Sequence, residues 1–146
     1  ENCDNFTPRH YRQFIKPILT ADIDLAHQYG AKFGFMMTSN CMPLLDDIRE
    51  TGTDAIIGVD PEQWDLEIAQ QKLGGRVCLW GGVNGHLTVE LGKSEEVRAE
   101  VRQALEILSA DGGFVLSPVD NVREYTPTSR ANVAALIDEW KQVTGQ

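Results

Sequence analysis

Apolar residues recur along the chain in two alternating patterns, short continuous runs and helical spacing. A helical period covers residues 8–29, where Thr7 and Pro8 provide a start and Gly30 an end. Four apolar runs follow, each short enough for a buried strand and each succeeded by a segment of helical period. These predicted strands are residues 31–37, 54–59, 76–83 and 113–116. The sequence therefore predicts one leading helix and four strand–helix units, in the order α(βα)4.

Capping residues and glycines mark the ends of the predicted helices. Residues 43–50 form a helix that Gly52 ends, and Gly74-Gly75 ends the helix after the second strand. We expect Asp60 to cap that second helix, with Gln63 reaching back toward it in the manner of a capping box.

The last two helices have the clearest periodicity. Ser94 is expected to cap the first of them, and Thr126-Pro127 to start the second. A connection of about ten residues after Asn84 exceeds the usual loop of about 2–6 residues and is a candidate functional loop. The expected inward residues are Val97, Val101, Ala104, Leu105 and Leu108 in the first helix, and Val133, Leu136, Ile137 and Trp140 in the second.

These units predict an α/β fold of the TIM-barrel, (β/α)8, type. Right-handed crossovers make the strands parallel and bring all four polar strand ends to one rim, where such barrels place their sites. A closed barrel needs about 250 residues, so 146 residues amount to about half a barrel. We expect a single domain over 1–146. Since the chain begins with Glu1 and not Met, we also expect a fragment of a longer protein.

The chain is acidic, with a formal net charge of -9 at pH 7, and it has no cluster of Lys or Arg. This argues against nucleic acid or an anionic membrane as a partner. Cys3, Cys41 and Cys78 are odd in number and lack CxxC spacing, which is typical of reduced thiols in a cytoplasmic protein. Nothing in the sequence resembles a signal peptide or a transmembrane run.

Several segments resemble the C-terminal half of the uroporphyrinogen decarboxylase superfamily. They follow in the order and spacing of that family and together cover nearly the whole chain. The segments are Pro8-Arg9-His10-Tyr11-Arg12-Gln13-Phe14-Ile15-Lys16-Pro17, Leu44-Leu45-Asp46-Asp47-Ile48, Glu50-Thr51-Gly52-Thr53-Asp54-Ala55, Trp80-Gly81-Gly82-Val83-Asn84, residues 94–101, Gly112-Gly113-Phe114-Val115-Leu116 and Thr126-Pro127.

The resemblance implies one of two activities on such a barrel. One is decarboxylation of uroporphyrinogen in tetrapyrrole synthesis, and the other is zinc-dependent methyl transfer between a corrinoid and a thiol or related acceptor. Gly81-Gly82 and Glu50-Thr51-Gly52 are more similar to the methyltransferase-like branch, whereas Ile57-Gly58-Val59-Asp60 is equally similar to the decarboxylases.

The zinc ligands of the methyltransferase branch are replaced in this chain. In that branch the first strand of this half ends in His-x-Cys-Gly, whose His and Cys bind zinc. Counting back from Leu44, Met36 and Thr38 occupy those positions, and the remaining Cys ligand falls near Asp120. Cys41 alone does not make a zinc site. We therefore expect no metal in this chain, and the resemblance implies a corrinoid only as a co-substrate of the full-length protein.

The decarboxylase branch loses a contact at the same place. The resemblance implies that decarboxylases bind their polycarboxylate substrate with Arg and Asp from the N-terminal half and with a His after the last strand. That His position also falls near Asp120, whose carboxylate would repel an octa-acid product.

Candidate substrate-binding residues lie near the end of a predicted strand or after it. Met36 can face an apolar ligand, and His86 can act as an acid or base near neutral pH, although a lone loop histidine is more often solvated. Helix capping explains Asp60 without any ligand. No catalytic residue is assigned. The candidates are Met36, Thr38, Asn40, Asp60, Asn84, His86 and Asp120.

Three functional hypotheses remain open at this point. The chain is half of a methyltransferase-like barrel without its zinc ligands, half of a uroporphyrinogen decarboxylase, or a non-catalytic barrel fragment that binds a small molecule or has a structural role. In each case we expect a small-molecule ligand at the strand-end rim. A half-barrel also has two open sheet edges, so we expect a homodimer through these edges.

Overall fold

The computed structural model describes residues 7–146 and contains one four-stranded sheet in the order β1-β2-β3-β4. The strands are β1 (Gly34–Met36), β2 (Ala55–Val59), β3 (Cys78–Asn84) and β4 (Phe114–Val119). All neighbouring pairs are parallel. The predicted α/β class with parallel strands is confirmed, as is the α(βα)4 order.

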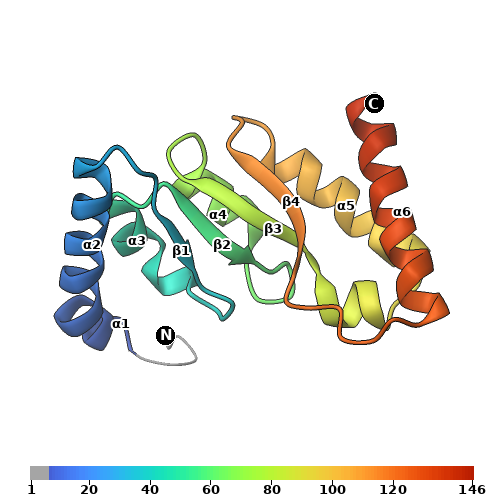
Figure 1. Cartoon of the computed structure of the whole chain (residues 1–146), viewed down its shortest axis with the longest axis horizontal. Coiled ribbons are helices and arrows are strands. Elements are labelled where there is room, and N and C mark those ends of the chain that lie inside the picture. The colour runs from blue at the N-terminus through green and yellow to red at the C-terminus, as the bar shows by residue number, and fades with distance from the viewer. Residues whose placement is uncertain (1–6) are drawn as a thin grey trace.

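Helices cover one face of the sheet and flank its two ends. Figure 1 shows α3, α4 and α5 behind the sheet, with α2 beside β1 at one end and α6 beside β4 at the other. Among residues 7–146, no helix lies over the opposite face of the sheet. The helical elements are α1 (Pro8–His10), η1 (Tyr11–Ile15), α2 (Lys16–Gln28), η2 (Met42–Leu44), α3 (Leu45–Glu50), α4 (Leu66–Leu73), η3 (Gly85–Glu90), α5 (Ser94–Leu108) and α6 (Pro127–Thr144).

The leading helix changes its winding before Pro17. The segment η1 is π-helical, and the N–H of Lys16 bonds to the carbonyl oxygen of Tyr11 five residues earlier. Proline has no N–H to donate, and the wider turn places it near the start of a new α-helix instead of in a helix interior. The leading helix is therefore interrupted before Pro17 by a π-helical turn.

Two predicted helix caps are wrong. Asp60 does not cap α4, because a turn follows it and Asp65 holds the cap position, where its side chain accepts a bond from the N–H of Ile68. Ser94 is the first residue of α5 and not its cap. Lys93 precedes the helix, and the Glu96 carboxylate accepts the N–H of Lys93. Gly52 and Gly74 follow their helices as predicted.

Two connections also differ from the predictions. The long connection after β3 is not a loop, because residues 85–90 form the π-helical segment η3. Strand β4 continues through Val119, three residues past the predicted end. In register, Gly82 pairs with Ser117 and Asn84 with Val119, so the longer β3 supplies a partner for the extended part of β4.

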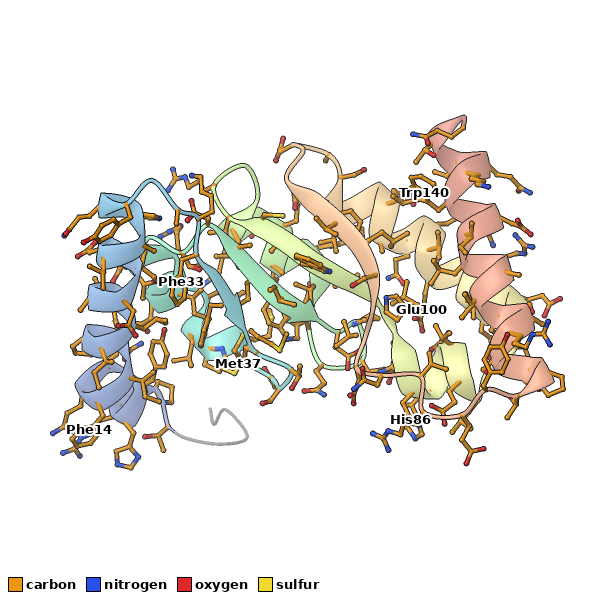
Figure 2. All side chains as sticks on the ribbon, viewed as in Figure 1. Phe14, Phe33, Met37, His86, Glu100 and Trp140 are labelled. Atoms are coloured by element: carbon orange, nitrogen blue, oxygen red, sulfur yellow. The ribbon has the colours of Figure 1, made fainter. Side chains whose placement is uncertain are left out.

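The two last helices bury faces of different chemistry. Every predicted inward residue of α5 is buried, from Val97 to Leu108. The buried residues of α6 are Ser129, Asn132, Ala135 and Glu139, whereas Val133 and Ile137 are exposed and Trp140 is partly buried (Figure 2). The prediction that Val133 and Ile137 face the core is therefore wrong.

The uncovered face of the sheet carries an apolar row. Met36, Ile57, Trp80 and Val115 are aligned by the strand register. Met36 is 65% exposed, and Trp80 and Val115 are each 39% exposed. Leu79, the neighbour of Trp80, points to the other face and is buried against the helices. Cys78 is only half buried because it shares the face of Trp80.

Candidate functional site

A pocket of about 360 Å³ lies where the uncovered face meets the carboxyl ends of the strands. Met36, Ile57 and Trp80, three members of the apolar row, contribute to its apolar lining together with Pro118 and Val119. Its polar side chains come from the segments that follow β1 and end β4. They are Thr38, Ser117, Asp120 and Asn121. The pocket thus combines an apolar floor with a polar rim.

Backbone geometry at two positions shapes this pocket. Gly58 lines it with φ +111°, and a side chain there would collide with the backbone carbonyl of Met37. The register between β2 and β3 also shifts between Ile57 and Val59. Asp120, directly after β4, has φ 69° and is the one non-glycine residue of the described chain with positive φ. Such backbone is uncommon outside glycine, and Asp is among the residues that tolerate it.

Behind the rim, two predicted site residues bond to each other and not to the pocket. The Asn84 side-chain amide donates to both Asp60 oxygens at 3.0 and 3.2 Å, and both residues are buried. The Asn84 side-chain oxygen accepts the N–H of Leu87 at 2.7 Å, which caps η3. Asp60 also accepts the N–H of Glu62 at 3.0 Å. These bonds tie the end of β2 to the end of β3.

Glu100 extends this network from the helix layer. Its carboxylate accepts the backbone N–H of Asn84 at 2.8 Å and the Thr88 hydroxyl at 2.6 Å. Burial raises the pKa of Glu100 above its ordinary range, and the two hydrogen bonds oppose that rise. No prediction included Glu100, since its position on α5 gives no sign that it reaches the end of β3.

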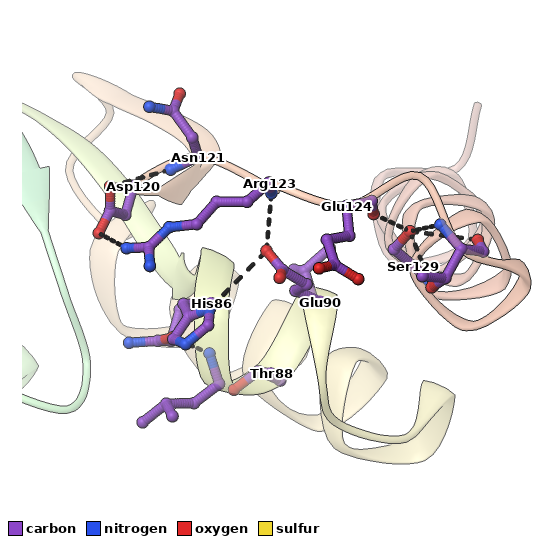
Figure 3. A network of polar contacts seen from close by, with 12 residues as sticks. His86, Thr88, Glu90, Asp120, Asn121, Arg123, Glu124 and Ser129 are labelled. Carbon is purple, nitrogen blue, oxygen red and sulfur yellow. Dashed lines mark hydrogen bonds and ion pairs between the residues drawn. The ribbon is translucent and has the colours of Figure 1, made fainter.

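His86 belongs to a separate polar cluster after β3 (Figure 3). Its Nδ1 lies 3.7 Å from the buried carboxylate of Glu90, which also accepts the backbone N–H of Arg123 at 2.7 Å. The Arg123 guanidinium lies 3.6 Å from Asp120, and Asp120 accepts the N–H of Asn121. The cluster fixes residues 120–123 against η3.

The structure brings together three of the seven predicted residues. Met36, Thr38 and Asp120 line the same pocket, although 82 residues separate Thr38 from Asp120. Asp60 and Asn84 pair beneath it, and His86 contacts Glu90 instead. Asn40 accepts the N–H of Met42 at the start of η2. Ile57 also lines the pocket and was missed. The period-2 alternation of β2 carries the signal for Ile57.

The described residues offer no built metal centre. Among residues 7–146, no group of three or more His, Cys, Asp or Glu side chains has the geometry to hold a metal ion. Cys41, the thiol nearest to Thr38 in the sequence, is fully buried in the core. A thioether, a hydroxyl and a carboxylate from Met36, Thr38 and Asp120 are also a poor match for zinc, which prefers thiolate and imidazole.

Comparison with known proteins agrees with the resemblance. The model of the family described as uroporphyrinogen decarboxylase (URO-D) matches residues 1–143. A uroporphyrinogen decarboxylase of Ralstonia nicotianae is 36% identical over 100 residues, covering 65% of this chain and 25% of that protein. One of Chlorobium phaeovibrioides is 32% identical over 99 residues, covering 66% and 26%. The chain therefore spans about a quarter of the length of these curated relatives.

A solved structure gives the second comparison. The chain is similar to a methyltransferase from Methanosarcina mazei with a TM-score of 0.76 and 25% identity. The match covers 95% of this chain and 38% of the methyltransferase. Within the described part of the chain, no helix has the length and apolar character needed to cross a membrane.

Proposed function

Because the chain belongs to the uroporphyrinogen decarboxylase family, we propose that it forms the substrate-binding rim of a methyltransferase-like barrel whose zinc ligands have been replaced. One observation supports this branch above the others. Met36, Thr38 and Asp120, the positions that the resemblance assigns to the zinc ligands, line a single pocket. The position of the site is retained while its donor atoms are changed.

The charge of the pocket weighs against uroporphyrinogen as the ligand. Of the described residues that line it, none is Lys, Arg or His, and Asp120 contributes a carboxylate. A substrate with several carboxylates needs cationic partners, and a carboxylate in the lining repels it. The pocket suits a small, partly apolar molecule.

The chemistry of this half is binding and orientation. Met36, Ile57 and Trp80 remove apolar ligand surface from water, and the side chains of Thr38, Ser117 and Asn121 offer hydrogen bonds at the rim. A corrinoid is the proposed co-substrate of the longer protein, and a cytoplasmic location is proposed from the odd number of cysteines and their lack of CxxC spacing.

The second candidate is uroporphyrinogen decarboxylation. The names and identities of the curated relatives favour it, since the relatives reported above are uroporphyrinogen decarboxylases that are 32–36% identical over about 100 residues. The third candidate, a non-catalytic binding or structural fragment, is favoured by the absence of a metal centre among the described residues.

A binding experiment on the 146-residue chain separates these candidates. The chain is dialysed against uroporphyrin, a stable octacarboxylate, and a panel of small methylated amines, ethers and thioethers is screened by saturation-transfer NMR. We expect at least one panel member to bind and uroporphyrin not to bind. Trp80→Ala removes pocket surface and should abolish the signal, whereas Leu25→Ala, an exposed site on α2, should leave it unchanged.

Two results would overturn the proposal. Stoichiometric uroporphyrin binding that Trp80→Ala weakens supports the decarboxylase candidate. Binding of neither class supports the non-catalytic candidate.

A further inference from the structure

The lining of the pocket at the strand-end rim combines one negative charge with an exposed aromatic ring, and this combination favours some small ligands over others. Of the described residues that line it, Asp120 alone carries a charge. Trp80 lies on its apolar side and keeps 39% of its surface exposed. An aromatic ring attracts a cation through its quadrupole, and tryptophan does so most strongly. The carboxylate of Asp120 in the same lining also attracts a cation.

We infer that this pocket binds a methylated ammonium cation, with the ammonium group between Trp80 and the carboxylate of Asp120 and its methyl groups against Met36 and Ile57. The inference rests on the proposed function, and it names the substrate class of the same site. A methylated ammonium group is cationic at its centre and apolar at its surface, so it matches both parts of the lining. It also carries the kind of methyl group that a methyltransferase transfers.

An internal cation already lies beside Asp120. The Arg123 guanidinium is 3.6 Å from the carboxylate, and the two side chains are 60% and 55% exposed. Ion pairs this exposed are weak because water screens them. A ligand cation can therefore replace Arg123 without leaving a buried charge behind.

The backbone at Asp120 does not depend on that guanidinium. The N–H of Arg123 donates to the buried carboxylate of Glu90, and this bond fixes the segment whatever the side chain is. Arg123→Gln thus removes the competing charge and leaves the backbone contact in place. Since the whole chain has a net charge of -9, cations are also enriched around it.

The test compares a cation with a neutral molecule of the same shape. Choline and its carbon isostere, in which a quaternary carbon replaces the nitrogen, are titrated into the 146-residue chain by NMR. We expect choline to bind about tenfold more tightly than the isostere, the range expected for a partly desolvated cation–π contact. Trp80→Leu keeps the site apolar and should remove most of this difference.

Two further variants test the charges. Asp120→Asn keeps a residue that tolerates positive φ, so it should fold normally while weakening choline binding and leaving the isostere unaffected. Arg123→Gln should strengthen choline binding by severalfold. Circular dichroism of each variant checks that the fold is intact.

The outcomes also separate this inference from the function on which it rests. Equal affinity for choline and its isostere overturns the assignment of a cationic ligand. The proposed function, a rim that binds a small molecule, then still stands. Choline binding that is insensitive to both Trp80→Leu and Asp120→Asn overturns the assignment as well, because the cation then lies elsewhere. Binding of uroporphyrin with neither small probe overturns both proposals.

Discussion

At the scale of single residues, Asn84 connects the end of β3 to three other elements through its backbone and its side-chain amide. It ends β3, caps η3, and bonds to Asp60 at the end of β2 and to Glu100 on α5. Its side chain is buried, so removal of the amide leaves the Asp60 carboxylate without its side-chain donor.

The first prediction follows from that network. Asn84→Ala should lower the free energy of unfolding by about 1–3 kcal/mol, the cost of an unsatisfied buried polar group. The matched control is Asn121→Ala, which removes an exposed amide at the pocket. This substitution should change the free energy of unfolding by less than about 0.5 kcal/mol. Urea unfolding measures both. Equal effects would mean that the bonds between Asn84 and Asp60 contribute nothing.

The second prediction concerns Glu139, a residue of α6 that is buried on the side facing α5. Bonds from Arg102 at 2.6 Å and Arg98 at 3.1 Å lower the pKa of Glu139 below its ordinary value of 4.5. The unfolded chain then binds this proton more readily than the folded one. The stabilisation is therefore complete above pH 4.5 and is lost as the pH falls through the lowered, folded-state pKa.

The measurement compares Glu139→Gln with the parent chain across pH. Because both arginines are partly exposed, we expect a loss of only about 1–2 kcal/mol near neutral pH. Denaturant unfolding at successively lower pH should show the two stability curves converging. Glu106→Gln, an exposed carboxylate on α5, is the control, and a gap that stays constant with pH would contradict the assignment.

How far the sequence predicts the site depends on where each residue's partner lies. Met36 ends β1, Thr38 and Asp120 follow strands, and parallel strands end at one rim, so their convergence is predictable. The pairing of Asp60 with Asn84 is not, because helix capping already explained Asp60 locally. Glu100 escaped prediction since its partner lies 16 residues away in another element.

At the scale of elements, Gly58 sets how closely the ends of β1 and β2 approach each other. Its φ of +111° is one that side chains rarely adopt, and a Cβ there meets the backbone of Met37. Gly112 also has positive φ, +74°, yet nothing lies within 4 Å of its missing Cβ.

This pair of glycines gives the third prediction. Gly58→Ala should cost about 2–6 kcal/mol, because backbone strain and a steric clash add, and it should weaken ligand binding in the adjoining pocket. Gly112→Ala should cost only the strain, about 1–2 kcal/mol, without an effect on binding. Thermal unfolding and ligand titration of both variants test this. If Gly58→Ala and Gly112→Ala lower the stability by similar amounts, the ends of β1 and β2 can move apart at little cost, and the prediction is wrong.

Periodicity predicted the elements well where apolar contact decides them. Helix α5 shows this, since its apolar stripe is its buried face. In helix α6 the apolar residues do not mark the buried face. Arg98 and Arg102 of α5 pair with Glu139, and this pairing offsets the cost of burying its carboxylate. The pattern of a single helix cannot show which charges the neighbouring helix carries. Asp60 and Asp65 could each cap the helix, because both carry the same carboxylate. The helix begins after Asp65, and Trp64, which precedes this cap, is buried.

At the scale of the whole molecule, apolar side chains gather at both ends of the sheet. Phe14, Ile18 and Leu25 are exposed on the leading helix, and Val133 and Ile137 are exposed on α6. Figure 1 places these helices at opposite ends of the sheet. Exposed apolar faces beside open strand edges favour association.

The fourth prediction is therefore a homodimer of the 146-residue chain. Light scattering should give a mass near twice 16.2 kDa, and the dimer fraction should rise with protein concentration. Ile18→Lys or Ile137→Lys should shift the equilibrium to monomer, whereas Leu87→Lys, an exposed position on η3, should not. If only one of the two lysine variants acts, the contact joins like faces, and if both act, it joins α2 to α6. A monomer at every concentration would contradict the prediction.

The polar docking of α6 has a consequence for recognition by any partner. The Asn132 amide donates to the carbonyls of Val89 and Gly92, and Glu139 is bonded to two arginines one heptad further on. Two anchors seven residues apart fix both the rotation and the axial position of the helix. A shift of α6 by one turn along its axis would leave a buried amide and a buried carboxylate without hydrogen-bond partners. The outward stripe of Val133 and Ile137 is thus presented in one orientation before anything contacts it, and a partner that covers it loses little conformational entropy from this side.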